Sequence, residues 1–142
     1  MTETAFFDTN VLVYVHDPRS PQKQQVARDL VKQYFSTGAG VLSTQVLQEL
    51  FVFLTAKIAN LPVPAVASLI ADYCAFPLVI IEPAHILNAV DLHARYQLSF
   101  WDGLILAAAK AAGASTLFSE DFSHGRTYDG VTLQNPFIGE RS

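Results

Sequence analysis

Residues 5–14 read AFFDTNVLVY, in which one apolar run stops at Asp8 and a second follows shortly after. The first run belongs to the apolar segment 4–7 (TAFF). We therefore predict a strand that ends at Asp8 and a short helix that starts at Thr9 or Asn10. An ionised carboxylate beside so much apolar sequence is costly unless another group compensates its charge. This order of strand, aspartate and helix indicates an element that presents a carboxylate at the end of a buried strand.

Three further acidic residues stand in equally well-defined contexts. They are Glu49 in STQVLQELF (43–51), Asp102 in LSFWDGLILAAA (98–109) and Asp121 in TLFSEDFSHG (116–125). Only 13 of the 142 residues are Asp or Glu, so these acids form a large share of the negative charge. Carboxylates that are brought together repel one another, and a hard divalent cation such as Mg²⁺ or Mn²⁺ is the usual remedy. Together with Asp8, the set suggests a metal-dependent enzyme that acts on phosphate.

Short apolar strands alternate with helical patterns along the chain. The predicted strands are 4–7, 40–42, 78–81 (a strand or a buried connector), 115–118 and 131–134. The predicted longer helices run from Ser20-Pro21 to about Phe35, from Ser43 or Thr44 to about Ala59, from Pro62 and Pro64 to Ala75, from Glu82-Pro83 to about Tyr96, and over 100–112 after a Ser99 cap. The order predicts an α/β fold, a three-layer domain with a mostly parallel central sheet of about four to five strands flanked by helices.

Length and composition favour one compact domain over residues 1–142. The chain is 51% hydrophobic and 15% charged, with a mean hydropathy of +0.27, so it can build a substantial core. It has no apolar stretch of roughly eighteen residues that predicts a membrane span, and its N-terminus lacks the basic start of a signal peptide. The lone Cys74 excludes an intramolecular disulfide and fits a reducing cytoplasm. Its apolar helical surroundings predict a core position.

The four acids are predicted to converge. Ligands of open parallel sheets bind beyond the carboxyl ends of the strands. Asp8 and Asp121 follow strands, while Glu49 and Asp102 lie near helix starts, and right-handed crossovers bring such places to a common edge. Each acid also has a local explanation: a helix cap for Asp8, a capping-box-like SFWD for Asp102, a solvated helix position for Glu49 and a turn for Asp121. Their joint occurrence in one α/β order favours a shared site.

Together these contexts resemble the PIN-domain ribonucleases, and most closely the VapC-type toxins of prokaryotic toxin–antitoxin systems. The matching segments are DTNVLVY (8–14), STQVLQEL (43–50), LSFWDGLILAAA (98–109) and LFSEDF (117–122), in that order. The resemblance implies a PIN-like fold and a Mg²⁺- or Mn²⁺-dependent endoribonuclease. It further implies that Asp8, Glu49, Asp102 and Asp121 form the catalytic metal site, with Glu120 as the alternative to Asp121. Asn10 and Ser99 match polar positions that support that site.

The resemblance also implies partners and a reaction. An RNA substrate, a cognate antitoxin and a homodimer are expected, and the reaction leaves a 5′-phosphate and a 3′-hydroxyl. Two cations about 3.5–4 Å apart suit an in-line displacement at phosphorus, although the sequence leaves one and two metals open. Two other readings stay open: a catalytically inactive PIN-like binding module, and a Mg-dependent phosphatase. A phosphatase of the haloacid dehalogenase class would carry a second Asp where this chain has Asn10.

Other residues are candidates for substrate contact. Because the net charge is −4, RNA binding requires a local basic patch or the metal ions themselves. The candidates for such a patch are Arg19, Lys23, Arg28 and Lys32 around the first long helix and Arg126 in the last polar loop, although a solvated face explains them equally. Trp101 either stacks on a base or packs in the core or in an interface, and the second reading is the more common one. The apolar helix 44–59 offers either core surface or a groove for an antitoxin helix.

Overall fold

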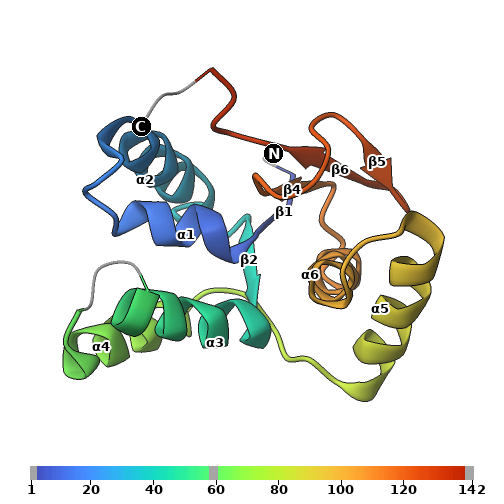
Figure 1. Ribbon diagram of the computed structural model, residues 1–142, viewed down its shortest axis with the longest axis horizontal. Helices are drawn as coiled ribbons and strands as arrows, with labels where there is room; N and C mark the ends of the chain where they lie inside the picture. The colour runs from blue at the N-terminus through green and yellow to red at the C-terminus, as the bar shows by residue number, and fades with distance from the viewer. Residues whose placement is uncertain (1–2, 58–60, 140–142) are drawn as a thin grey trace.

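The computed structural model describes residues 3–57 and 61–139. Its sheet has six strands in the order β3-β2-β1-β4-β6-β5. The strands are β1 (Ala5–Phe7), β2 (Gly40–Ser43), β3 (Leu78–Val79), β4 (Thr116–Phe118), β5 (Thr127–Tyr128) and β6 (Val131–Gln134). All neighbouring strands are parallel except β5 and β6. Helices flank this sheet (Figure 1), which confirms the predicted α/β architecture.

The helices follow the predicted order, and several end earlier than expected. They are α1 (Thr9–Val15), α2 (Pro21–Phe35), α3 (Thr44–Val52), the π-helical turn η1 (Phe53–Lys57), α4 (Val63–Tyr73), α5 (Pro83–Tyr96) and α6 (Phe100–Ala111). The predicted helix to Ala59 therefore changes to a π-helical turn after Val52, and its last two residues lie outside the described part of the chain. No helix in the described ranges has the length and apolarity to cross a membrane.

The sixth strand, β5, is the element that the sequence analysis missed. β5 and β6 form an antiparallel hairpin whose two-residue turn is Asp129-Gly130, both with positive φ (49° and 86°). An Asp-Gly pair is a strong signal for such a turn, because both residues tolerate the left-handed conformation. The residues before this turn are mostly polar and so carry no apolar strand pattern, which is why the sequence predicts β6 but places the residues of β5 in a loop.

Three predicted helix starts are confirmed, and the N-cap side chain makes a capping hydrogen bond at two of them. The Ser43 hydroxyl accepts a hydrogen bond from the Val46 amide at 3.3 Å, and the Ser99 hydroxyl accepts one from the Asp102 amide at 3.1 Å. Ser20 occupies the N-cap position of α2, but its side chain makes no capping bond. Pro21 at the first helical position has no amide hydrogen to satisfy, so the start of α2 depends less on a side-chain cap.

Aromatic side chains of the central strands form much of the core. Phe6 and Phe7 of β1 are both fully buried, as expected for a strand that is covered on both faces. The Phe7 ring lies 5.1 Å from the ring centres of Phe35 and Phe118. Cys74, in contrast, is exposed, so its predicted core position is wrong. It caps the end of α4, where the preceding Tyr73 takes the buried position.

The chain adds its first three strands toward one edge of the sheet and its later strands toward the other, so the strand order reverses between β1 and β4, which are parallel. After β1 the chain moves outward to β2 and β3, and it then returns through α5 and α6 to β4 on the other side of β1. The carboxyl ends of β1 and β4 meet there, where the Asp8 amide donates to the Phe118 carbonyl at 3.0 Å. Such a switch point is where open α/β sheets place their ligands. The helix α6 leads back to β4, so its N-terminal turn lies at the same edge.

Close packing of α5 against α6 gives the first testable prediction. A Cβ atom on Gly103 of α6 would lie 2.8 Å from the backbone carbonyl oxygen of Ala89 on α5. Helix propensity alone would make Gly103→Ala stabilising by about 1 kcal/mol, but the carbonyl is backbone and cannot rotate away. We expect Gly103→Ala to lower the free energy of unfolding by about 1–3 kcal/mol, as overpacking does. Urea unfolding measures it, and a more stable variant would contradict the close approach.

Candidate active site

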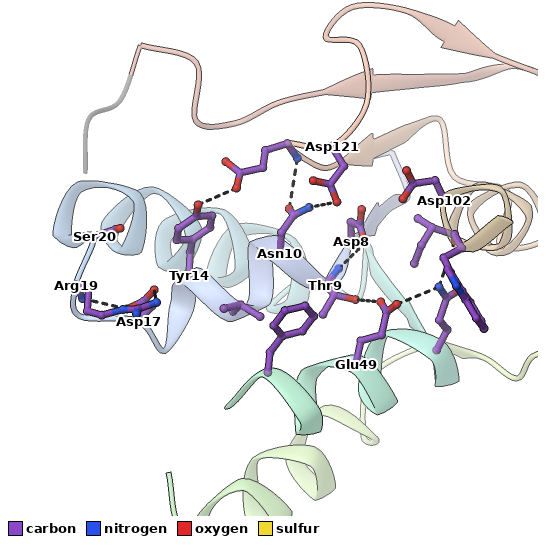
Figure 2. Close-up of a pocket in the computed structure, with 16 residues that line it drawn as sticks. Asp8, Thr9, Asn10, Tyr14, Asp17, Arg19, Ser20, Glu49, Asp102 and Asp121 are labelled. Atoms are coloured by element: carbon purple, nitrogen blue, oxygen red, sulfur yellow. Dashed lines mark hydrogen bonds and ion pairs between the residues drawn. The ribbon is translucent and has the colours of Figure 1, made fainter. Parts of the chain in front are cut away.

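A pocket of about 380 Å³ opens at this switch point, within the range of roughly 300–1,000 Å³ typical of small-ligand sites. Figure 2 shows the side chains that line it, which come from both sides of the switch and from α3. Its acidic lining residues are Asp8, Asp17, Glu49, Asp102, Glu120 and Asp121, whereas Arg19 is the one basic residue of the described lining. That guanidinium is already paired with Asp17 at 2.9 Å. The pocket is therefore strongly negative.

Three of the four predicted acids come together in this pocket. Asp8, Asp102 and Asp121 each offer a carboxylate oxygen, and these atoms all lie within 4.8 Å of one another. Asp8 directly follows β1, Asp102 lies in the first turn of α6, and Asp121 follows β4 by a short turn. Within the described residues no Lys or Arg forms an ion pair with any of the three. Three carboxylates at this separation, without a cationic side chain, form a site that a cation can neutralise.

Asp8 is the buried member of this cluster, with 4% of its surface exposed. One carboxylate oxygen accepts from the Thr9 amide at 2.7 Å, and the other accepts from the Ser119 hydroxyl at 2.7 Å. The predicted capping role and the role in the cluster therefore coexist. Burial raises the pKa of Asp8 to about 7; the Ser119 hydrogen bond lowers this pKa, and the nearby Asp121 carboxylate raises it further. Burial and the same neighbour also raise the pKa of Asp102.

Glu49 lines the pocket from α3 but lies outside the group of three. The Thr9 hydroxyl donates to one Glu49 carboxylate oxygen at 2.6 Å, and the Gln45 amide donates to the other at 3.4 Å. Figure 2 shows Glu49 on the α3 side of the pocket, next to Thr9 and farther from Asp102 and Asp121. These bonds hold the Glu49 carboxylate at the pocket wall, where it adds negative charge next to the cluster.

Asn10 ties the loop after β4 to the start of α1. Its side-chain NH₂ donates to the Asp121 carboxylate at 3.0 Å and to the Ser119 hydroxyl at 3.3 Å, while its carbonyl oxygen accepts from the Glu120 amide at 3.3 Å. The Ser119 hydroxyl in turn accepts from the Asp121 amide at 3.1 Å. This network fixes Asp121 beside Asp8. The supporting position predicted for Asn10 is consistent with these contacts, whereas Ser99 contributes by capping α6.

Glu120 points toward the helices on the other side of the loop. Its carboxylate accepts from the Tyr14 hydroxyl at 2.7 Å and from the Lys23 ammonium at 3.3 Å. Of the two neighbouring acids that the sequence left as alternatives, Asp121 shares the cluster with Asp8 and Asp102, and Glu120 is engaged by α1 and α2. Lys23, a candidate for substrate contact, is occupied by this interaction.

The predicted basic contacts do not gather around the cluster. Arg28 donates to the Val15 carbonyl at 3.0 Å, Lys32 is exposed near the end of α2, and the Arg126 guanidinium lies 4.7 Å from the centre of the Tyr128 ring. None of these three lines the described pocket. Sequence reasoning missed the polar groups that orient the acids, namely Thr9, Gln45 and Ser119. Thr9 and Ser119 lie close to the ends of predicted strands, and this position could have marked them as polar groups near the site.

Comparison with known proteins identifies the family to which this chain belongs. A family model described as PIN domain matches residues 5–129, which is most of the chain and includes all four predicted acids. This chain belongs to the PIN-domain family. A search of curated protein sequences gives no match.

Solved structures share the fold of this PIN domain at low sequence identity. A toxin–antitoxin complex from Klebsiella pneumoniae matches with a TM-score of 0.70 and 18% identity over 94% of this chain and 98% of that chain. Mycobacterium tuberculosis VapC20, described as a toxin that cleaves the sarcin–ricin loop, matches with a TM-score of 0.65 and 17% identity over 83% and 92%. DNA-bound VapBC from Salmonella typhimurium matches with a TM-score of 0.67 and 13% identity over 95% and 99%. The expected PIN-like fold is thereby confirmed.

The raised pKa of Asp8 in this PIN domain gives a prediction about stability. Its folded pKa of about 7 lies above its ordinary value of 3.8, so the metal-free protein loses stability as the pH rises from about 4 to 7. We expect Asp8→Asn in EDTA to raise the free energy of unfolding near pH 7.5 by about 1–4 kcal/mol and to change it little near pH 4. Urea unfolding of both proteins at the two pH values measures this.

The exposed Asp72 on α4 supplies the control. Asp72→Asn should leave stability nearly unchanged at both pH values, since an exposed carboxylate carries no comparable desolvation penalty. A variant at Asp8 that is no more stable than the wild type near pH 7.5 would mean that this carboxylate ionises without cost in the fold.

Proposed function

We propose that this single PIN domain is a metal-dependent endoribonuclease, and that it acts as the toxin of a toxin–antitoxin pair. The observation that carries the proposal is the cluster of Asp8, Asp102 and Asp121, whose carboxylate oxygens lie within 4.8 Å of one another in a pocket at the sheet's switch point. Membership of the PIN-domain family supports nuclease chemistry at this place. The likeness to toxin structures supports the toxin role.

The donor set fits Mg²⁺ or Mn²⁺. Both are hard cations that prefer carboxylate and water oxygens, and the cluster offers carboxylates without any thiol or imidazole. A cation bound there would neutralise the substrate phosphate and activate a water molecule for attack on phosphorus. Asp8, Asp102 and Asp121 would hold it directly, and Glu49 would complete the shell directly or through water. A cation bound there would favour the ionised form of Asp8 and so oppose the effect of burial on its pKa.

The supporting residues give the site its rigidity. Asn10 and Ser119 orient the Asp121 and Asp8 carboxylates, while Thr9 and Gln45 orient Glu49. Removing a neighbour that orients a ligating carboxylate typically lowers metal affinity or activity by about 10–100-fold. Because the pocket is negative, an RNA phosphate can approach only after cations have entered. We propose that Arg28, Lys32 and Arg126, which do not line the pocket, contact more distant parts of the RNA, whereas Arg19 at the pocket wall stays paired with Asp17.

The proposed partners are an RNA substrate, a cognate antitoxin and a second copy of the chain. An apolar groove between α3 and α4 suits an amphipathic antitoxin helix. It is lined by Leu47, Gln48, Phe51, Ala67 and Ile70. Solved neighbours described as toxin–antitoxin complexes support such a partner. We propose that the protein acts in the cytoplasm, where it would meet both an RNA substrate and a cognate antitoxin.

Cleavage of total cellular RNA by the purified protein tests the nuclease. We expect discrete fragments with Mg²⁺ or Mn²⁺, none with EDTA, and a loss of at least about 100-fold in rate for Asp8→Asn and Asp102→Asn. Asp72→Asn, which removes an exposed carboxylate outside the pocket, should cleave like the wild type. Intact RNA with bound metal would favour the inactive binding module. Hydrolysis of p-nitrophenyl phosphate without RNA cleavage would favour the phosphatase.

A pair of neighbouring variants identifies the acid that follows β4. Asp121→Asn removes a member of the cluster, so we expect it to weaken Mn²⁺ binding by about 10–100-fold. Glu120→Gln keeps an acceptor for the Tyr14 hydroxyl and should change Mn²⁺ affinity much less. Calorimetric titration of both variants with Mn²⁺ measures the difference. A larger loss for Glu120→Gln would assign the metal role to Glu120 instead.

A further inference from the structure

Trp101 is a large aromatic side chain at the edge of the negative pocket. It directly precedes Asp102, lines the pocket, and is 61% exposed. The core position that is common for tryptophan is therefore wrong here. Its only described ring contact is edge-on with Phe100, at 5.2 Å between ring centres, which leaves most of the indole surface uncovered.

The backbone that carries this indole is firmly held. Gln45 on α3 is 4% exposed and donates from its amide to the Trp101 carbonyl at 3.2 Å and to the Glu49 carboxylate at 3.4 Å. The Ser99 hydroxyl caps the same turn of α6 through the Asp102 amide. One buried side chain thus connects Trp101 to the acidic wall. An aromatic group on a helix end fixed in this way keeps its place relative to the cluster better than one on a loop.

We propose that Trp101 is a stacking platform for an unpaired nucleobase next to the phosphate that is cleaved. The inference rests on the proposed nuclease function. A nucleobase carries no charge, so it can approach a pocket with six acidic residues where a phosphate needs a cation. Every base has a π-face, and stacking on indole is therefore tolerant of sequence but requires a base that is free of its own helix.

The surroundings of Trp101 favour a base over a protein partner. Other exposed large apolar side chains gather away from the pocket, such as Ile86, Leu87 and Val90 on α5. Trp101 instead lies beside Asp102 and near Glu49, where an apolar protein surface would have to bury carboxylates without a cationic partner. A nucleotide brings its phosphate to the cation and its base to the indole, and so matches both halves of the site.

Tryptophan fluorescence gives a direct test because Trp101 is the single tryptophan of the chain. The probe is a mixed-sequence single-stranded oligoribonucleotide of about ten nucleotides, added to the wild-type protein with Ca²⁺, which also binds carboxylate oxygens and so leaves the acidic cluster intact and neutralised. We expect saturable quenching, and much weaker quenching by the same sequence as a duplex. Equal quenching by both, or none, would overturn the proposal. So would emission that changes with protein concentration and not with RNA, because Trp101 would then face another copy of the chain.

Kinetics separates this inference from the proposed function. Trp101→Ala should lower kcat/KM on single-stranded RNA by about 5- to 150-fold, the range for loss of one base–aromatic stack, while Mn²⁺ affinity stays unchanged. Trp101→Phe should recover most of the activity, and Leu87→Ala, which removes an equally exposed apolar side chain on α5, should cleave like the wild type. Unimpaired cleavage by Trp101→Ala would overturn the platform and keep the nuclease. If RNA quenches the fluorescence of a wild-type protein that never cleaves RNA, the stacking role of Trp101 stands and the proposed nuclease function is overturned.

Discussion

The buried carboxylate of Asp8 accepts hydrogen bonds from the Thr9 amide and the Ser119 hydroxyl, and the rest of the site is arranged around it. These two donors belong to the segments that leave β1 and β4, the strands on either side of the switch point. One side chain thus starts α1, joins the ends of two central strands and presents its charge to the pocket. The price of this arrangement is desolvation, which raises the pKa of Asp8 to about 7.

Five of the six acids of the pocket fall into two electrostatic groups, while Glu49 is held by the neutral side chains of Thr9 and Gln45. Asp17 and Glu120 are paired with Arg19 and Lys23, respectively. Asp8, Asp102 and Asp121 have no such partner within the described residues, and they are the ones that lie within 4.8 Å of one another. A fold selected for stability alone would pair or separate these charges. Unpaired acids that lie this close together lower the stability of the fold, and such groups are typical of functional sites.

Most of the fold was readable from the sequence because its signals are local. The strand before Asp8 and the helix after Ser99 follow from apolar periodicity, capping residues and glycines, each acting within a few residues. Strand β6 was predicted, but its hairpin partner β5 was missed because it has only two residues, Thr127 and Tyr128, and follows a polar stretch. The core positions expected for Cys74, from its apolar neighbours, and for Trp101, as one of two packing alternatives, were both wrong. The helical face that a residue occupies depends on what packs against the helix, which a local pattern does not record.

The sequence by itself determined the α/β order, the PIN-like character and the four acids that a cation site would use. The α/β order follows from short-range chemistry at strands and helix ends, whereas the PIN-like character and the set of four acids come from the resemblance of their sequence contexts to that family. Tertiary structure alone decided which carboxylates share a cluster: Asp121 joined it, Glu120 turned to Tyr14 and Lys23, and Glu49 remained at the wall. These residues are far apart in the chain, and the direction in which each side chain points depends on partners up to 111 positions away. Such distances and hydrogen bonds exist only once the sheet has brought its strand ends together.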